Sequence, residues 1–190
     1  MGIREEQKEQ RRQQILYSAL ELFVLNGFAA TKITDIAKKA SMSTGLLFHY
    51  FDSKEQLYEE LVRFGLEAMR YPLQIEGDLV TEQLEIFVTQ LFGYIQENTW
   101  AAYFFVLMAE AQRNRGIPSK ARELACSVNT IKAFVPLIKL GQEQGAIREG
   151  NPITLSNAFW SSIQGIAEQY VTHPEMELPE PCWILDIIKK

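Results

Sequence analysis

The chain has 190 residues, of which 47% are hydrophobic and 23% are charged. These proportions suit one or two packed domains and exclude a long disordered protein. The net charge of −5 argues against a chain that binds nucleic acid over its whole surface.

Charge is divided unevenly along the chain. Residues 1–54 carry eight basic and six acidic side chains, whereas the remainder carries 11 basic and 18 acidic side chains. Opposite balances in the two parts suggest that only the first part meets a polyanion.

The two cysteines, Cys126 and Cys182, lie far apart and form no cluster with histidine. Neither a disulfide framework nor a zinc site is therefore expected, and a reducing cytoplasm is the simpler location. The charged N-terminal segment lacks an apolar signal core, and no apolar run is long enough for a membrane span. We expect no metal, no cofactor and no membrane partner.

Helical periodicity runs through almost the whole chain, and strand alternation is absent, so the sequence predicts an all-α protein of about nine helices. The first helix is expected over residues 6–26, with Ile15, Ala19 and Phe23 on its buried stripe. Gly27 follows as a natural C-terminal cap, because glycine enters the left-handed conformation at little cost.

Three shorter helices are expected next. Thr31 is predicted to cap the second, Ser43 the third (residues 44–51), and the capping-box spacing after Asp52 and Ser53 begins a fourth that ends near Arg70. The remaining helices are predicted over residues 78–98, 100–113, 119–144, 152–172 and 181–189.

Residues 32–51 then hold two short helices joined by a tight turn, which is the size of a helix-turn-helix. Such a motif packs its first helix inward and presents the second to a major groove. Gly45 weakens the second helix, yet its missing side chain suits close approach to DNA. The alternative is a structural helical hairpin with an ordinary solvated face.

The stretch TKITDIAKKASMSTGLLFHYFDSKEQL and the preceding LELFVLNGF resemble the TetR family of repressors nearly position by position. The resemblance covers about residues 9–69, and it implies a DNA-binding domain there. For residues 70–190 it implies a helical domain that senses a ligand and forms a homodimer.

The resemblance also implies roles for single residues. Thr44 and Gly45 would approach base edges, Phe48 could touch a thymine methyl group, and His49 and Tyr50 would contact phosphate or bases. Lys54 would hold a phosphate beside a helix N-terminus. Two further residues, Thr31 and Ser43, could donate to phosphate, although both could equally serve as plain helix caps.

The second domain offers only candidate residues. A hydrophobic effector could be lined by bulky side chains, although such side chains fill cores more often than they line pockets. The candidates are Phe64, Phe92, Phe104, Met108, Phe134 and Trp160.

Small residues beside bulky ones on the helix at 152–172, together with the apolar last helix, predict an intersubunit bundle. An intramolecular core is the alternative for the last helix. The candidate interface residues are Ala158, Ser162, Gly165, Ile166, Trp183 and Ile187.

An enzyme would need clustered acid, base or nucleophilic groups. The two histidines, His49 and His173, lie in the DNA motif and in a loop, and no phosphate-cradling glycine loop occurs. The sequence therefore predicts no enzyme, and the resemblance implies a regulator that binds palindromic operator DNA as a repressor and is released by a small hydrophobic molecule. A transcriptional activator and a ligand-independent recruiting factor are the alternatives.

Overall fold

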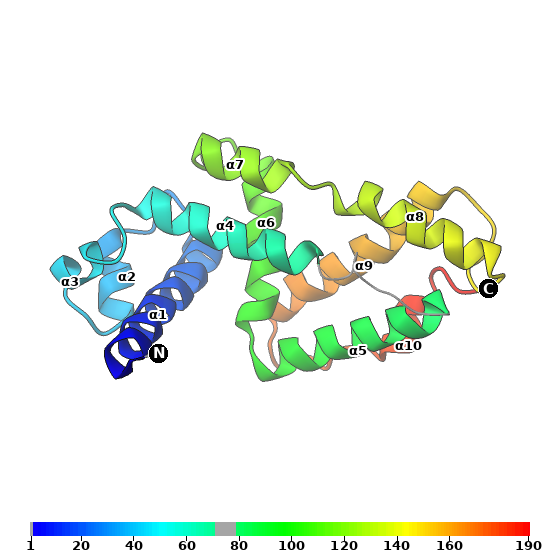
Figure 1. Ribbon diagram of the computed structural model, residues 1–190, viewed down its shortest axis with the longest axis horizontal. Helices are drawn as coiled ribbons and strands as arrows, with labels where there is room; N and C mark the ends of the chain where they lie inside the picture. Colours follow the sequence, from blue (N-terminus) through cyan, green and yellow to red (C-terminus); the bar gives the residue numbers. More distant parts are fainter. Residues whose placement is uncertain (1, 71–78) are drawn as a thin grey trace. The chain divides into compact units, whose positions relative to one another are not determined.

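The computed structural model describes residues 2–70 and 79–190, and these residues form ten α-helices connected by loops and turns (Figure 1). The prediction of an all-α fold is confirmed. Two compact units emerge, one of residues up to Gly65 with Val106–Cys126, the other of Leu66–Phe105 with Ser127–Lys190. The predicted domains at 9–69 and 70–190 therefore differ from these units mainly in the placement of Val106–Cys126.

The first unit is built around a long N-terminal helix whose inner face is apolar. Ile15, Ala19 and Leu20 on this helix are fully buried, and Gly27 ends the helix with φ +80° as its N–H donates to the Phe23 carbonyl. The helices that contribute to this unit are α1 (Ile3–Asn26), α2 (Ile33–Lys39), α3 (Thr44–Phe48), the start of α4 (Lys54–Arg70), the end of α6 (Trp100–Arg113) and α7 (Ser119–Cys126).

An aromatic trio joins the helices of the first unit. The Tyr58 ring lies 5.1 Å from the Phe23 ring and 5.2 Å from the Phe28 ring, both edge-on. The Tyr58 hydroxyl donates to the Leu107 carbonyl at 3.5 Å. Burial raises the pKa of Tyr58, and the Glu110 carboxylate raises it further, so the phenol stays neutral and keeps its proton for donation.

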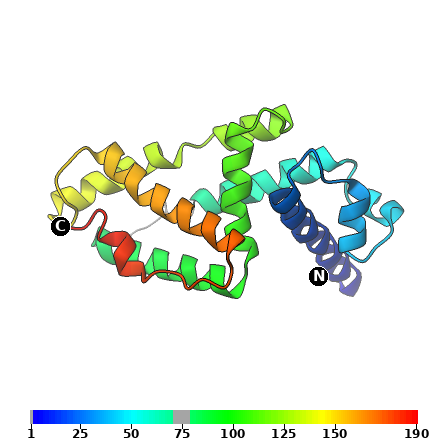
Figure 2. The ribbon, with the colours of Figure 1, turned by 180° about the vertical axis from the view of Figure 1, so that it is seen from behind.

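The second unit has one apolar core, to which α5 (Val80–Glu97), the start of α6, α8 (Thr130–Glu143), α9 (Pro152–Thr172) and α10 (Pro181–Leu185) contribute. The end of α4 also belongs to this unit. Helix α8 packs along α9, and α10 packs along α5 (Figure 2). The core includes Leu84, Phe134, Phe159 and Ile163, each fully buried. Asp78, where the fifth helix was expected to begin, lies outside the described residues.

The single long helix predicted over residues 119–144 is wrong. The chain leaves the helix after Cys126, and Asn129 starts α8 by accepting a hydrogen bond from the Lys132 N–H at 2.9 Å. Although residues 119–143 together are apolar and long enough to cross a membrane, the break leaves helices of eight and 14 residues. Both are shorter than the roughly 20 residues that a bilayer requires.

The end of the chain also differs from the expectation. Helix α10 ends at Leu185, and Lys189 then pairs with Ile147 in an isolated antiparallel bridge. Ile184, Leu185 and Ile188 are buried in the chain's own core. The intramolecular alternative therefore accounts for these three residues, whose apolar character had suggested an intersubunit contact.

Candidate nucleic-acid interface

Backbone hydrogen bonds set the corner between α2 and α3. The N–H of Ser41 donates to the Lys38 carbonyl at 3.1 Å, and that of Met42 donates to the Ala37 carbonyl at 3.0 Å. Ser41 adopts φ +56°, the left-handed conformation that turns the chain sharply out of α2. The corner thus holds α3 at a defined angle to α2.

Ser43 starts α3 as predicted. Its hydroxyl oxygen accepts a hydrogen bond from the Leu46 N–H at 3.2 Å, which satisfies one of the free donors of the first turn. The capping expected before α4 is also present, because the Ser53 hydroxyl accepts from the Gln56 N–H at 3.1 Å. Both helices therefore begin at the side-chain caps that the sequence predicts.

The inner side of α3 is anchored by two apolar side chains. Leu47 and Phe51 are 0% and 1% exposed. The Arg12 guanidinium lies 5.2 Å from the centre of the Phe51 ring and forms an ion pair with Glu60. Residues from α1 and α4 therefore hold the end of the motif in place.

The outer side of α3 is open. Ser43, Gly45, Phe48 and His49 are exposed, and Thr44 and Tyr50 are half-buried. The structure thus brings six of the eight predicted DNA-contacting residues onto or beside one short helix. Phe48 is 46% exposed, so its ring is accessible to a partner.

Gly45 is not required by the chain's own packing. A Cβ atom added there meets no atom within 4 Å, and the residue lies in regular helix. An alanine would fit and would favour the helix. The absence of a side chain leaves room at this point for something that approaches from outside.

Thr31 lies inside the protein. It is 2% exposed, and its hydroxyl lies within hydrogen-bonding distance of the Leu22 carbonyl at 3.0 Å and the Gly27 carbonyl at 2.8 Å. The prediction that it caps the second helix is wrong, because Lys32 occupies the N-cap position. Its hydroxyl proton is committed to these carbonyls, which leaves the side chain no part in a phosphate contact in this conformation.

Lys54 is also engaged with the protein. Its Nζ donates to the carbonyls of Phe28 at 2.7 Å and Thr31 at 2.9 Å. An ammonium group has three donors, so one remains for a phosphate. The contact of Lys54 with DNA stays a prediction. Within the protein, Lys54 holds the loop before α2.

Two exposed lysines at the ends of α2 were not among the DNA-contacting residues predicted from the sequence. Lys32 and Lys38 are exposed and have no ion pair among the described residues, whereas Lys39 pairs with Glu21 at 2.8 Å. Their positions at the two ends of the helix preceding α3 would have been sufficient to single them out. Both are candidates for phosphate contacts.

The predicted effector-lining residues do not form one group. Phe92, Phe134 and Trp160 share the core of the second unit, and the Phe134 and Trp160 rings are 5.5 Å apart. Phe104 packs edge-on against Trp100, 5.8 Å away. Phe64 and Met108 belong to the first unit, where Phe64 is 43% exposed and Met108 is 1% exposed.

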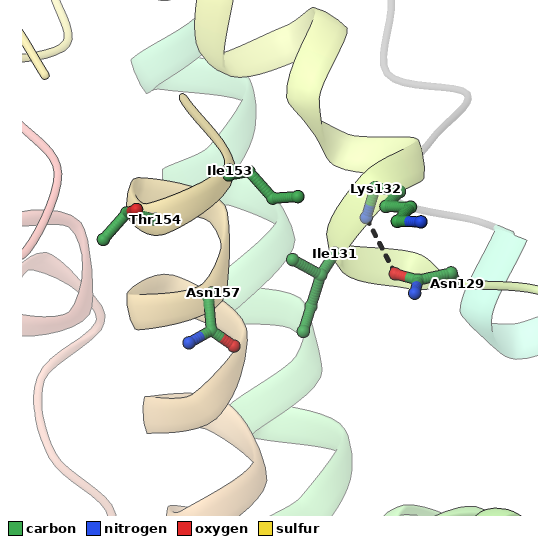
Figure 3. Close-up of a pocket in the computed structure, with 6 residues that line it drawn as sticks. All are labelled: Asn129, Ile131, Lys132, Ile153, Thr154 and Asn157. Atoms are coloured by element: carbon green, nitrogen blue, oxygen red, sulfur yellow. Dashed lines mark hydrogen bonds between the residues drawn. The ribbon is translucent and has the colours of Figure 1, made fainter. Parts of the chain in front are cut away.

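An open pocket of about 360 Å³ lies between the starts of α8 and α9 (Figure 3). None of the predicted effector-lining residues borders it. Ile131 and Ile153 face the space between the two helices in this view. The lining residues are Asn129, Ile131, Lys132, Ile153, Thr154 and Asn157.

The candidate dimer residues lie at differing depths. Gly165 and Trp183 are exposed, while Ala158, Ser162, Ile166 and Ile187 are half-buried. Ile166 and Ile187 already pack against the core of their own unit. Helix α8 adds an apolar exposed stripe, Ala133, Pro136 and Leu140, which is not among the candidates predicted from the sequence.

Comparison of the sequence with known proteins relates this chain to one family. Residues 15–61 match the family described as "Bacterial regulatory proteins, tetR family". Over 168 residues the chain is 43% identical to the HTH-type transcriptional repressor KstR2 of Rhodococcus jostii, covering 86% of this chain and 80% of that protein.

Two solved structures share the fold over most of both chains. The fatty acid degradation regulator FadR from Bacillus halodurans aligns with a TM-score of 0.63 at 19% identity, over 93% of this chain and 92% of its own. AibR in complex with isovaleryl coenzyme A and operator DNA aligns with a TM-score of 0.69 at 17% identity, over 93% and 94%.

Proposed function

Because this chain belongs to the TetR family of bacterial regulatory proteins, which bind DNA and are not enzymes, we propose that it is a repressor of transcription. In this proposal a homodimer binds a two-fold symmetric operator, and a small apolar molecule releases it. Its place of action is then the cytoplasm, where the operator lies.

The main support for this DNA-binding mode is the solvent-exposed outer face of α3, where Gly45 in the first turn has no side chain. In the bound state the start of α3 enters the major groove, where Thr44 and the Gly45 backbone meet base edges. Phe48 packs against a thymine methyl group. His49 and Tyr50 contact the flanking backbone or bases.

Phosphates on either side would be held by the remaining polar groups of the motif. The Ser43 hydroxyl, the free donor of Lys54, and the exposed Lys32 and Lys38 are the candidates. These contacts carry no sequence information but fix the register of α3 in the groove. They also make the affinity fall steeply with salt.

Dimerisation is assigned to the exposed faces of α8 and α9. Gly165 is exposed on α9, and the apolar stripe of Ala133, Pro136 and Leu140 is exposed on α8. Because these side chains are small or apolar, two copies of the chain can approach closely there. Trp183 offers a large apolar side chain that is 60% exposed. The two α3 helices of such a dimer must lie about 34–36 Å apart to enter successive major grooves.

The effector is proposed to be an acyl compound that binds within the helical second unit. The two structural relatives concern fatty acid degradation and isovaleryl coenzyme A respectively. The core of this unit, which contains Phe92, Phe134 and Trp160, is apolar and aromatic, as an acyl chain requires.

The effector acts by preferring one spacing of the two α3 helices over another, which typically couples the two sites by about 1–3 kcal/mol. Helices α4 and α6 each contribute residues to both units, so they are the elements through which the effector would act.

Selection of binding sites from random duplexes tests the DNA-binding mode. A two-fold symmetric consensus, bound by one dimer, is expected. Selected duplexes without symmetry, or indifference to every duplex at low salt, would overturn the proposal.

Reporter transcription from the selected operator, with and without acyl-coenzyme A thioesters, tests repression and release. Repression that the thioesters relieve is expected. Raised transcription would identify an activator, and repression that no thioester changes would identify a ligand-independent factor.

A further inference from the structure

Trp160 carries a buried hydrogen-bond donor that the protein does not use. Its indole Nε1 is shielded from solvent and has no hydrogen-bond partner, the one such side-chain atom found among the described residues. Buried tryptophan N–H groups usually find an acceptor, because leaving one unpaired costs free energy. A buried donor without an acceptor is rare in native proteins, so this one requires an explanation.

The surroundings of Trp160 are aromatic. Its ring lies 5.5 Å from that of Phe134, 5.7 Å from that of Phe159 and 6.0 Å from that of Phe87. These three phenylalanines are each less than a tenth exposed and come from α8, α9 and α5. Helix α9 thus places a polar atom where three helices meet around apolar side chains.

The polar side chain one turn further along α9, Gln164, is already occupied. One turn after Trp160, the Gln164 amide nitrogen donates to the Phe105 carbonyl at 3.2 Å and to Glu168 Oε1 at 2.8 Å. Gln164 is therefore held away in its own hydrogen bonds, and Trp160 is left as the free donor of this part of the core.

We propose that the Trp160 indole N–H is the polar anchor for the effector and donates to the carbonyl oxygen of an acyl thioester, with the acyl chain among Phe87, Phe134 and Phe159. This assignment rests on the proposed function and deepens it. The acceptor is a neutral carbonyl, because a free carboxylate would be buried among phenyl rings with no cation to balance it. A thioester presents a neutral carbonyl beside an apolar chain.

Three probes isolate the carbonyl. They are octanoyl-coenzyme A, its thioether analogue S-octyl-coenzyme A, which lacks only the carbonyl oxygen, and free octanoate. The full-length dimer is expected to bind the thioester about tenfold more tightly than the thioether, which is the usual effect of one hydrogen bond and its desolvated partner. Octanoate is expected to bind weakly.

The three tryptophans make the donor directly visible. In ¹⁵N-labelled protein each indole gives one ¹H–¹⁵N signal, and those of Trp100, Trp160 and Trp183 are assigned by single Trp→Phe variants. Octanoyl-coenzyme A is expected to move the Trp160 proton downfield, whereas S-octyl-coenzyme A is not. Trp100, whose ring packs against those of Tyr94 and Phe104 and not against Trp160, serves as the internal reference.

Trp160→Phe removes the donor and keeps an aromatic ring. It is expected to lose the tenfold preference for the thioester over the thioether while the Trp100→Phe control retains it. The indole signal of the wild-type protein provides the same test without any substitution, so poor folding of the variant does not remove it.

The outcomes separate the two proposals. If the thioester binds and the Trp160 signal stays where it is, or if the thioether binds equally well, this assignment is overturned while the effector class stands. If no acyl-coenzyme A of short, medium or long chain binds at all, the effector class fails, and the assignment to Trp160 fails with it.

Discussion

The Lys54 ammonium group lies 4.2 Å from the centre of the Phe28 ring and donates to the Phe28 carbonyl, so one lysine at the start of α4 holds the loop that precedes α2. A second hydrogen bond reaches the Thr31 carbonyl. The family resemblance gives this residue a contact with DNA, and the structure adds a contact with the protein. The two roles make different predictions.

Replacing Lys54 by methionine keeps the apolar stem and removes the charge. Two carbonyls lose a charged donor, so we expect a loss of stability of roughly 1.5–3 kcal/mol, measured by urea unfolding. Affinity should fall for every duplex alike, and the slope of affinity against salt should flatten by about one if the third donor holds a phosphate.

Lys38→Met is the matched control, because Lys38 is exposed and has no ion pair among the described residues. It should leave stability within about 0.5 kcal/mol of the wild type. Equal stability of the two variants would contradict the role of Lys54 within the protein.

Replacing Gly45 by alanine should separate stability from DNA binding. The added methyl group meets no atom of the chain, and alanine favours helix by up to about 1 kcal/mol over glycine. We therefore expect a slightly higher melting temperature and at least tenfold weaker operator binding in fluorescence anisotropy.

The control for this prediction is Gly93→Ala, a helical glycine of α5 that also has open space around it. It should gain similar stability and bind the operator normally. Unimpaired operator binding by Gly45→Ala would show that α3 does not approach DNA at this position.

Replacing Thr31 by valine tests whether its hydroxyl acts inside the protein. Valine keeps the shape but leaves the Leu22 and Gly27 carbonyls without the hydroxyl donor, so we expect roughly 1–3 kcal/mol of destabilisation. Thr31→Ser, which keeps the hydroxyl, should remain close to the wild type. The exposed Thr34 supplies the control substitution, Thr34→Val, which should have little effect on unfolding.

Replacing Gly165 by glutamate tests the dimer face. A Cβ added there meets no atom of the chain within 4 Å, so the monomer should fold. Two like charges brought together in a two-fold interface should prevent association. Sedimentation should report a monomer with normal helical content and at least a hundredfold weaker operator binding. Thr89→Glu, exposed on α5, should remain dimeric. A dimeric Gly165→Glu would move the interface elsewhere.

The helices of the motif could be predicted well because their signals are local. Gly27 ends α1, and Ser43 starts α3 through its own side chain. Leu47 and Phe51, one turn apart, are both buried as the helical spacing requires. Each of these features depends on neighbours within a few residues.

The errors arose where one local signal was outweighed by another interaction. Thr31 has a residue type that caps helices, but carbonyls four and nine residues away take its hydroxyl. Asn129 interrupts a continuous apolar pattern with a side-chain cap that composition does not reveal. The unpaired donor of Trp160 could not be foreseen, because an unsatisfied atom becomes visible only when all its neighbours are placed.

The left-handed backbone of Ser41 restricts how this corner can change over evolutionary time. A residue with φ +56° tolerates glycine, asparagine, aspartate or a small polar side chain, whereas a β-branched residue would strain it. Relatives that recognise other operators are therefore expected to differ on the outer face of α3 and to keep one of these residue types at the position of Ser41. The corner at Ser41 therefore accepts far fewer residue types than the DNA-facing side of α3 that follows it.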